Sequence, residues 1–409
     1  MEIEEFLKTS LTAYHATKNC EKILLKHGFV QLNIKKAWNL VQGGKYYVTK
    51  NQSSIIAFVV GDLSEYYFNI AEAHTDSPSL KVKGEGLVET KGGKRINIET
   101  YGSLIQYSIL DIPLKIAGRV FVNEDNKILA KLVESNVNIN IPSLAFHLNR
   151  SVNEGIKFSV QNDLLPLAGD AESVYSFFDI KNIIEADLFV VPDVKPFYSG
   201  INNEYLCSPR LDNLVSAWVV ITSLCKCNPK GISVACCFDN EEIGSVTKQG
   251  ASSSFLTIIL EKINIALNKS KVEFISACEK GMMLSVDNTH AVHPAHGERS
   301  DVSAQVEMGN GIVIKHNRNY STDGYSAAKL KSMLKSNRID YQDFYNNSDL
   351  VCGSTLGLFT SALMSMNSCD IGIPQLAMHS TIETMMRKDI ASLQTCCNVF
   401  YDTFFDCCN

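Results

Sequence analysis

Histidine and carboxylate side chains stand at the ends of four apolar runs in this sequence. These endings are His74 with Asp76, Asp239 with Glu241 and Glu242, Asp287, and His379, and a further carboxylate, Asp212, opens a predicted helix. In layered α/β proteins, ligands bind in the crevice beyond the carboxyl ends of the strands. We therefore expect these side chains to converge on one site, although they are far apart in the sequence.

Two histidines and several carboxylates without a thiolate are typical of a hydrolytic metal centre. Imidazole and carboxylate suit zinc, cobalt or manganese, and a bridging carboxylate can hold two ions about 3.5–4 Å apart, which lowers the pKa of a water between them. Neighbouring side chains at a strand end point to opposite faces, so one of Glu241 and Glu242 is expected to bind metal and the other to accept the water's proton. Asp76, two residues after His74, is expected to hydrogen-bond the far imidazole nitrogen and fix the tautomer that binds metal.

Each of these signals has a structural alternative. Taken alone, Asp212 is typical of a helix N-cap, and the adjacent Glu241 and Glu242 are typical of a solvated turn. The joint occurrence of the endings favours a metal site, because carboxylates that follow buried strands, with no cation nearby in the sequence, need one.

Two other motifs stay open. The Gly-Ser-Thr run at 353–355 looks like a nucleophile turn, but an N-cap for a helix over 356–363 is the favoured interpretation. His290, His293 and His296 are either outer-sphere or substrate-binding groups, or polar loop residues. The chain lacks a GxSxG elbow, an HExxH helix, a Walker loop and a GxGxxG after a strand, which excludes the enzyme classes that depend on them.

The elements that must position these residues predict an α/β fold. Strands are expected at 45–49, 54–60, 67–73, 232–238, 282–286, 312–315 and 370–373, and helices over the first 27 residues and at 211–226, 251–267, 323–335, 354–365 and 381–404. This alternation favours three α/β/α layers with helices on both faces of the sheet. Between the halves, short alternating segments and charged turns are typical of a β-rich insertion. We predict a discontinuous α/β domain, residues 1–84 and 206–409, interrupted by a smaller β-rich domain at 85–205.

Composition limits the classes of partner. The chain has 409 residues, with 38 Lys and Arg against 44 Asp and Glu and a net charge of −6, so no broad basic surface for nucleic acid is expected. No apolar run approaches the ~18 residues of a membrane span and the N-terminus lacks signal-peptide features, so we expect a cytoplasmic protein without a membrane partner. Thirteen Cys, an odd count without a CxxC pair, argue against a disulfide framework.

Five motifs, in this order, resemble those of the aspartyl aminopeptidase family. They are AHTDSP at 73–78, RLDN at 210–213, DNEEIGS at 239–245, SVDNTHAVHP at 285–294 and PQLAMHS at 374–380, with further similar stretches at 53–60, 141–150 and 352–355. The resemblance implies a two-metal aminopeptidase of the zinc exopeptidase superfamily, which removes an N-terminal residue, preferably Asp or Glu, from peptides. It also implies that the β-rich insert makes dimer contacts and that dimers assemble into a tetrahedral dodecamer.

The same resemblance implies a role for each site residue. His74 and Asp287 correspond to the ligands of one metal ion, Glu242 and His379 to those of the other, and Asp212 to the bridging ligand; Glu241 corresponds to the general base and Asp76 to the residue that orients His74. The metal ions are expected to be zinc, with cobalt or manganese as alternatives. Lys315 corresponds to a lysine near the acidic side chain of the substrate, and His147 to a histidine that enters the active site from the neighbouring subunit's insert.

The sequence departs from the family pattern at 100–114. Family members commonly have a Gly-Gly pair and an Asp-Arg stretch there, whereas this chain reads YGSL at 101–104 and LDIPL at 110–114. The change leaves substrate preference and oligomer contacts open. Alternatives are therefore an aminopeptidase or deacylase of neutral or broad specificity on the same scaffold and, less favoured, a catalytically silent shell or binding protein.

Overall fold

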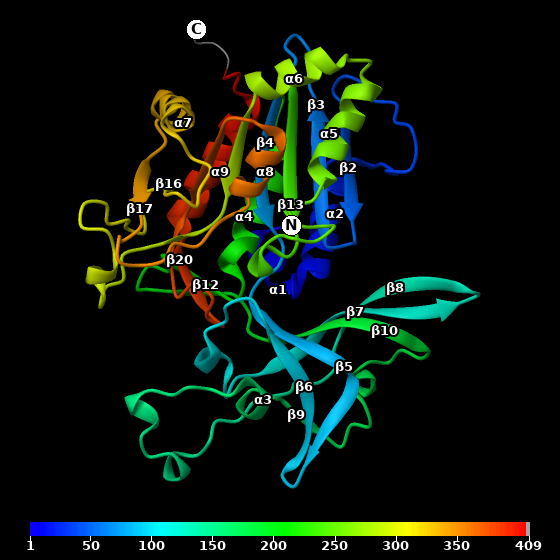
Figure 1. The fold of residues 1–409 in the computed structure, drawn as a ribbon, viewed down its shortest axis with the longest axis vertical. Coiled ribbons are helices and arrows are strands. Elements are labelled where there is room, and N and C mark those ends of the chain that lie inside the picture. Colours follow the sequence, from blue (N-terminus) through cyan, green and yellow to red (C-terminus); the bar gives the residue numbers. More distant parts are fainter. Residues whose placement is uncertain (406–409) are drawn as a thin grey trace.

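The computed structural model describes residues 1–405, which form a layered α/β part and a β-rich part beneath it (Figure 1). The larger sheet has nine strands in the order β1-β2-β3-β13-β4-β14-β18-β16-β17. Their bounds are Val30–Gln31, Lys45–Lys50, Ser54–Val60, Ile232–Phe238, Phe68–His74, Met282–Val286, Ser368–Gly372, Ile312–His316 and Tyr341–Tyr345, in that order. The central strands β13, β4, β14 and β18 run parallel, so their carboxyl ends meet at one edge.

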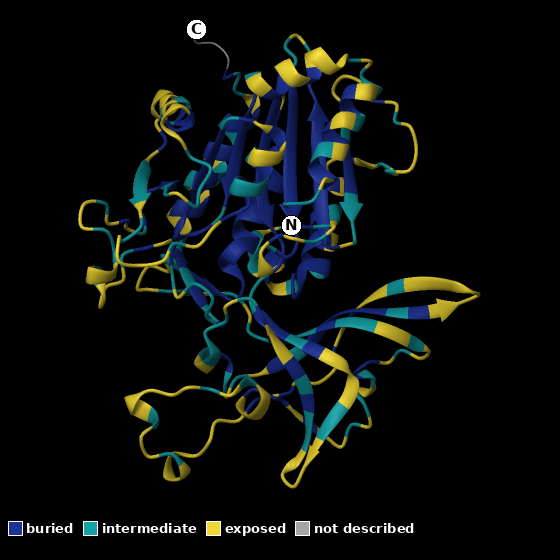
Figure 2. Cartoon of the chain, viewed as in Figure 1, coloured by how far each residue is buried: buried dark blue, intermediate teal, exposed yellow. Residues whose placement is uncertain are grey.

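Helices cover both faces of this sheet. On one face lie α1 (Ile3–Thr9), α2 (Ala13–Lys26), α4 (Leu211–Leu224), α7 (Gly324–Ser336) and α9 (Arg387–Asp402), and on the other α5 (Phe255–Ala266), α6 (Lys271–Lys280) and α8 (Gly357–Met364). Successive strand residues alternate between the two cores: Ala57 packs under the first helix group and Phe58 under the second, as the period of two requires. The middle of the sheet is therefore buried from both sides (Figure 2), and the predicted three-layer α/β/α fold is confirmed.

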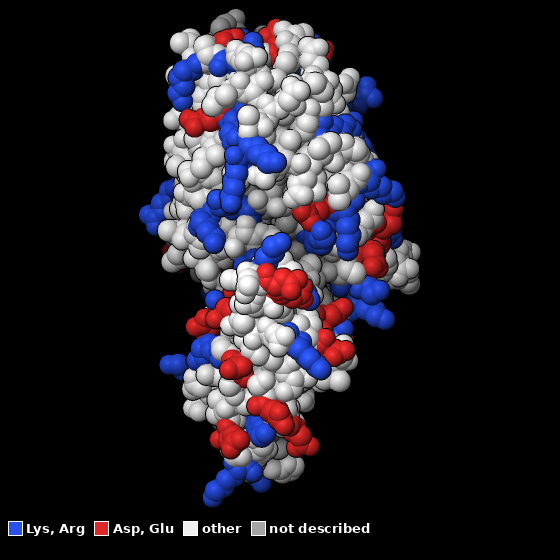
Figure 3. All heavy atoms as spheres, turned by 90° about the vertical axis from the view of Figure 1, so that its right-hand side faces the viewer, with Lys and Arg blue, Asp and Glu red and all other residues white. Residues whose placement is uncertain are grey.

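The β-rich part contains a six-stranded antiparallel sheet with its own apolar core. Its order is β8 (Lys127–Glu134), β7 (Leu114–Glu124), β10 (Ile183–Pro192), β5 (Ser79–Thr90), β6 (Gly93–Tyr101) and β9 (Leu167–Gly169). A long segment between β8 and the short helix α3 (Val160–Asp163) lies at the bottom left of Figure 1, away from the larger sheet. Basic and acidic side chains are interspersed over the lower half of the face drawn in Figure 3.

A third sheet, which the sequence did not lead us to expect, joins segments near the site. Its order is β11 (Phe197–Ser199), β12 (Tyr205–Ser208), β20 (Glu383–Met386), β19 (Pro374–Leu376) and β15 (Thr289–His290). The predicted helix at 381–404 is wrong at its start, because residues 383–386 pair with β12 and the helix begins at Arg387. The predicted N-terminal helix is two helices, because Thr12 is extended and begins a second one.

Other sequence expectations concern the helices at 251–280, the cysteines and membrane spans. The helix predicted from 251 begins at Phe255, and α6 was not predicted. Within residues 1–405, eleven cysteines carry free thiols and ten of them are buried; Cys407 and Cys408 lie outside the described residues. Among the described helices, none combines the length and the apolar character that crossing a membrane requires.

Candidate metal centre

Six of the predicted residues come together at the carboxyl edge of the larger sheet. His74 is the last residue of β4, Asp287 follows β14, and Glu241 and Glu242 form a 3-10 turn after β13. Asp212 lies in the first turn of α4, where its φ and ψ are non-helical, and His379 follows β19. Their donor atoms form three overlapping trios, each within 4.8 Å: His74-Asp212-Asp287, Asp212-Glu242-His379 and His74-Glu241-Glu242.

The two carboxylate oxygens of Asp212 face different histidines. Oδ1 lies 3.4 Å from Nε2 of His74, and Oδ2 lies 3.8 Å from Nε2 of His379. Asp287 completes the first group, with Oδ1 3.5 Å from His74 Nε2, and Glu242 the second, with Oε2 3.4 Å from His379 Nε2. Asp212 thus has the geometry of a bridging ligand between two groups of donors.

The cluster has the properties that divalent cations require. Within the described chain, Oδ1 of Asp212 and Oδ1 of Asp287 are buried without a hydrogen-bond partner. Buried carboxylate oxygens are normally paired, and burial of an unpaired charge is costly. Imidazole nitrogens and carboxylate oxygens are donors that suit zinc, so the two trios that share Asp212 fit two ions.

Burial and, after it, crowded negative charge determine the pKa values of the two glutamates in the cluster. Burial raises the pKa of Glu241 to about 8. His74 lowers this pKa, whereas Asp287 and other nearby carboxylates raise it further. Burial and Asp212 also raise the pKa of Glu242 well above its ordinary value. Burial lowers the pKa of His74, but the nearby carboxylates of Asp212, Asp287 and Asp76 raise it well above the usual range overall.

Asp76 supports the site differently from the sequence expectation. The backbone carbonyl of Asp76, not its carboxylate, lies at hydrogen-bond distance (3.0 Å) from Nδ1 of His74; the nearer carboxylate oxygen is 3.5 Å away. The carboxylate instead accepts hydrogen bonds from the backbone N–H groups of Glu241 (3.1 Å) and Glu242 (3.2 Å) and from the hydroxyl of Tyr101 (2.7 Å). Asp76 therefore fixes the turn that carries both glutamates.

The first half of the altered segment at 100–114 contacts residues of the metal centre. The backbone carbonyl of Ser103 lies 3.1 Å from Nδ1 of His379. Gly102 has φ +69°, a conformation that favours glycine, and a Cβ there would lie 3.1 Å from the Cβ of Glu242, a tight contact. The second half packs in the β-rich part, where Asp111 accepts hydrogen bonds from Ser143.

Glu383 is a site residue that sequence reasoning missed. Its buried carboxylate accepts hydrogen bonds from the backbone N–H of Asp212 (2.9 Å) and of His379 (2.7 Å). His379 has φ +67°, a conformation that non-glycine residues adopt only where the surroundings hold them. The sequence shows a carboxylate four residues after the predicted ligand His379. We did not consider it as a site residue, because it lay inside the helix predicted over 381–404.

A cavity of about 470 Å³ opens beside the cluster and contains Lys315. The ammonium of Lys315 lies 3.6 Å from Oδ2 of Asp287 and over the ring of Tyr320. Although burial raises the pKa of Asp287, Lys315 and His74 lower it below its ordinary range overall. His290 and Ser354 also line this cavity, and Ser354 is not a helix cap, because α8 follows Leu356, whose side chain makes no capping hydrogen bond.

Three predicted residues lie apart from this cavity. His293 and His296 line a neighbouring cavity together with His290, and their rings are 5.1 Å apart. His147 lies in an exposed 3-10 turn, Phe146–Leu148, in the segment between β8 and α3. The described chain therefore does not bring His147 to its own metal centre.

Comparisons with known proteins agree with the fold and the metal centre. The profile of the family described as "Aminopeptidase I zinc metalloprotease (M18)" matches residues 6–177 and 171–405. A "Probable M18 family aminopeptidase 2" of Clostridium novyi is 38% identical over 404 residues, or 93% of each chain. A solved complex of Ape4 and Nbr1 contains a chain with TM-score 0.92 and 30% identity, covering 98% of this chain and 84% of that chain.

A further solved structure has the same fold at lower identity. The S. cerevisiae mApe1 dodecamer matches with TM-score 0.84 and 24% identity over 98% of this chain and 95% of that chain. The resemblance read from the five motifs is thus confirmed by the full-length matches. This chain belongs to the M18 (aspartyl aminopeptidase) family and is a zinc metallo-aminopeptidase, a hydrolase of peptide bonds.

Proposed function

We propose that this aminopeptidase prefers peptides with an acidic N-terminal residue and that its reaction takes place in the cavity beside Asp287. The observation that carries the proposal is Lys315, the one Lys or Arg among the described residues that line this cavity. Its side chain is buried, and a buried cation recognises a carboxylate more strongly than an exposed one does. An Asp or Glu side chain in the cavity would share this ammonium with Asp287.

In the proposed mechanism, His74 and Asp287 would hold one zinc ion, Glu242 and His379 would hold the other, and Asp212 would contribute a ligand to both. Zinc bound there would supply Lewis-acid polarisation of the scissile carbonyl and would lower the pKa of the attacking water. Glu241 accepts the proton of that water and returns it to the leaving amine. Asp76 holds Glu241 in place for this task through the backbone hydrogen bond at 3.1 Å.

A preference for neutral N-terminal residues is the second candidate. The ammonium of Lys315 already lies 3.6 Å from Oδ2 of Asp287, so part of its charge is compensated before a substrate binds. The altered segment at 101–104 also reaches His379 through Ser103. Both observations bear on selectivity and leave the proposed chemistry unchanged.

A substrate panel separates the two candidates. We would measure release of p-nitroaniline from Asp, Glu, Leu and Lys substrates before and after chelation and zinc restoration. We expect zinc-dependent turnover with higher kcat/KM for Asp and Glu. In Lys315→Met, which keeps the length of the stem, KM for the acidic substrates should rise about tenfold or more relative to that for Leu. Equal losses for all four substrates would favour the neutral candidate.

We also propose that the predicted domain at 85–205 is a dimerisation domain and that the protein assembles as a dodecamer. The dodecameric mApe1 structure supports this, as do Leu144, Phe146 and Leu148, which are 60%, 53% and 74% exposed. Apolar side chains gathered on one exposed segment are typical of an interaction surface. His147 lies within this segment, and we propose that it enters the active site of a neighbouring subunit.

A further inference from the structure

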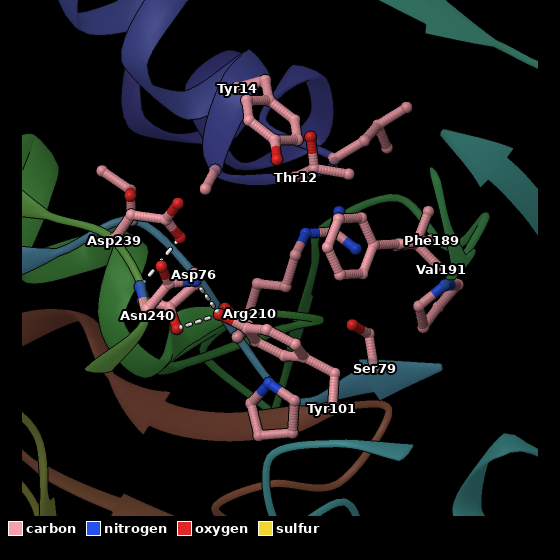
Figure 4. A pocket seen from close by; sticks show the side chains of 16 residues that line it. Thr12, Tyr14, Asp76, Ser79, Tyr101, Phe189, Val191, Arg210, Asp239 and Asn240 are labelled. Atoms are coloured by element: carbon pink, nitrogen blue, oxygen red, sulfur yellow. Dashed lines mark hydrogen bonds between the residues drawn. The ribbon is translucent and has the colours of Figure 1, made fainter. Parts of the chain in front are cut away.

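A second cavity lies behind the metal centre, at the junction of α2, the six-stranded sheet and the start of α4. It has a volume of about 40 Å³ and is lined by the N-terminal turn of α2, by Ser79 and Phe189, and by Arg210 (Figure 4). One water needs roughly 10–15 Å³ by this measure. The cavity therefore has room for one small ion with a water or two, and it is too small for a peptide.

Arg210 supplies an unpaired cation to this cavity. The residue is only 9% exposed, and within the described chain Nε and Nη1 have no hydrogen-bond partner. Nη2 makes one long contact, 3.5 Å, to the carbonyl of Leu7. Burial lowers the pKa of Arg210 to about 10, while Glu383 and Asp193 raise it from a distance, so the guanidinium remains charged. A buried charge without an adjacent counterion is unfavourable.

The N-terminus of α2 points to the same cavity and is an independent feature. This helix has 14 residues, Thr12 precedes it, and no side chain caps its first turn. Thr12, Ala13 and Tyr14 line the cavity. The unpaired N–H groups at a helix N-terminus, together with the helix dipole, favour an anion.

The two carboxylates of the cavity lie on the other side from the guanidinium. Figure 4 shows Asp76 and Asp239 at the left and the end of Arg210 pointing toward Phe189. Asp76 is already engaged by three donors, and Asp239 accepts a hydrogen bond from the backbone of Asn240 at 2.8 Å. Neither carboxylate makes an ion pair with Arg210 in the described structure, so the cationic side of the cavity is left without a counterion.

We propose that this cavity is a binding site for a small monovalent inorganic anion of chloride size, held by Nε and Nη1 of Arg210 and by the first turn of α2. The bound anion links α2 to the segment that carries Asp212, two residues after Arg210. It therefore stabilises the fold at the rear of the metal centre. Anion binding in this cavity requires neither the proposed substrate preference nor the roles given to the metal ligands.

Thermal unfolding of the full-length protein tests the site. We would compare potassium chloride with potassium gluconate at constant ionic strength, since gluconate is too large to enter. Chloride should raise the Tm of the natural protein saturably by about 2–5 °C. Arg210→Met should abolish this rise, and Arg210→Lys should retain part of it. Arg338→Met is the matched control, because Arg338 is exposed and also has a positive φ (55°).

A measurement on the natural protein keeps the test decisive if the Arg210 variants fold poorly. Crystals soaked in sodium bromide should give an anomalous peak within about 3.5 Å of the guanidinium nitrogens of Arg210. A peak there supports the site. A non-saturable chloride effect, or bromide only at the surface with water alone beside Arg210, would overturn the proposal.

Discussion

Glu241 is the residue whose removal should stop the chemistry without emptying the metal centre. Its carboxylate lies in the trio with His74 and Glu242, yet the two groups that share Asp212 are complete without it. We expect Glu241→Gln to lower kcat by about 10²–10⁴ while the protein keeps its zinc, measured by elemental analysis beside steady-state kinetics. Glu298→Gln, at an exposed position of the 3-10 turn Gly297–Arg299, is the control. Near-normal turnover of the Glu241 variant would remove it from the role of general base.

Glu383 should act on zinc affinity through the backbone of two ligands. It accepts hydrogen bonds from the N–H groups of Asp212 and His379, and Gln would place an NH₂ group against one of them. Loss of such supporting contacts typically weakens metal binding by 10–100-fold, so we expect Glu383→Gln to raise the Kd for zinc in chelator competition by that factor. Glu279→Gln, on the surface end of α6, provides the control. A variant that loses Tm but keeps zinc affinity would show that Glu383 has only a structural role.

At the scale of elements, the sequence predicted the long strands, whose apolar residues form regular patterns. The strands expected at 54–60, 232–238 and 282–286 have these bounds in the structure, because long buried strands have an apolar pattern that is independent of their partners. Convergence of their endings followed from the parallel arrangement of the central strands. The third sheet could not be predicted in this way, because its strands of two to four residues are defined by pairing with distant segments. Glu383 was missed for the same reason.

Strand β4 contains a buried carboxyl group whose ionisation opposes folding. Glu72 accepts a hydrogen bond from Oγ1 of Thr360 at 2.6 Å, and burial raises its pKa to about 8. The unfolded chain therefore releases this proton at lower pH than the folded chain, and stability falls as pH rises between the ordinary value of 4.5 and about 8. Glu72→Gln removes this dependence and keeps an acceptor for Thr360.

We therefore expect the stability advantage of Glu72→Gln over the natural protein to grow with pH by up to about 1.4 kcal/mol per unit and to level off above pH 8. Thermal or urea unfolding at pH 5, 6, 7, 8 and 9 measures this difference. Glu89→Gln, at an exposed position of β5, controls for loss of surface charge. An advantage that does not change with pH would mean that Glu72 is ionised in the folded strand.

At the scale of the whole molecule, the position of His147 makes a prediction about assembly. His147 lies in the exposed apolar segment of the β-rich part, and the cavity at the metal centre is lined by other described residues of the same chain. If a neighbouring subunit receives this histidine, His147→Ala and Glu241→Gln damage different parts of one composite site. Each variant alone should then have low activity.

Mixing the two variants under conditions of subunit exchange separates action between subunits from action within one. In a mixed dimer, the chain with the His147→Ala substitution retains Glu241 and receives His147 from its partner, which restores one intact site. The other site lacks both groups, so an equal mixture should recover up to about a quarter of natural activity when exchange is random. Light scattering should show the same oligomer for both variants and for the mixture. Activity equal to the mean of the separate variants, after exchange has been verified with labelled subunits, would place the function of His147 within its own chain or outside catalysis.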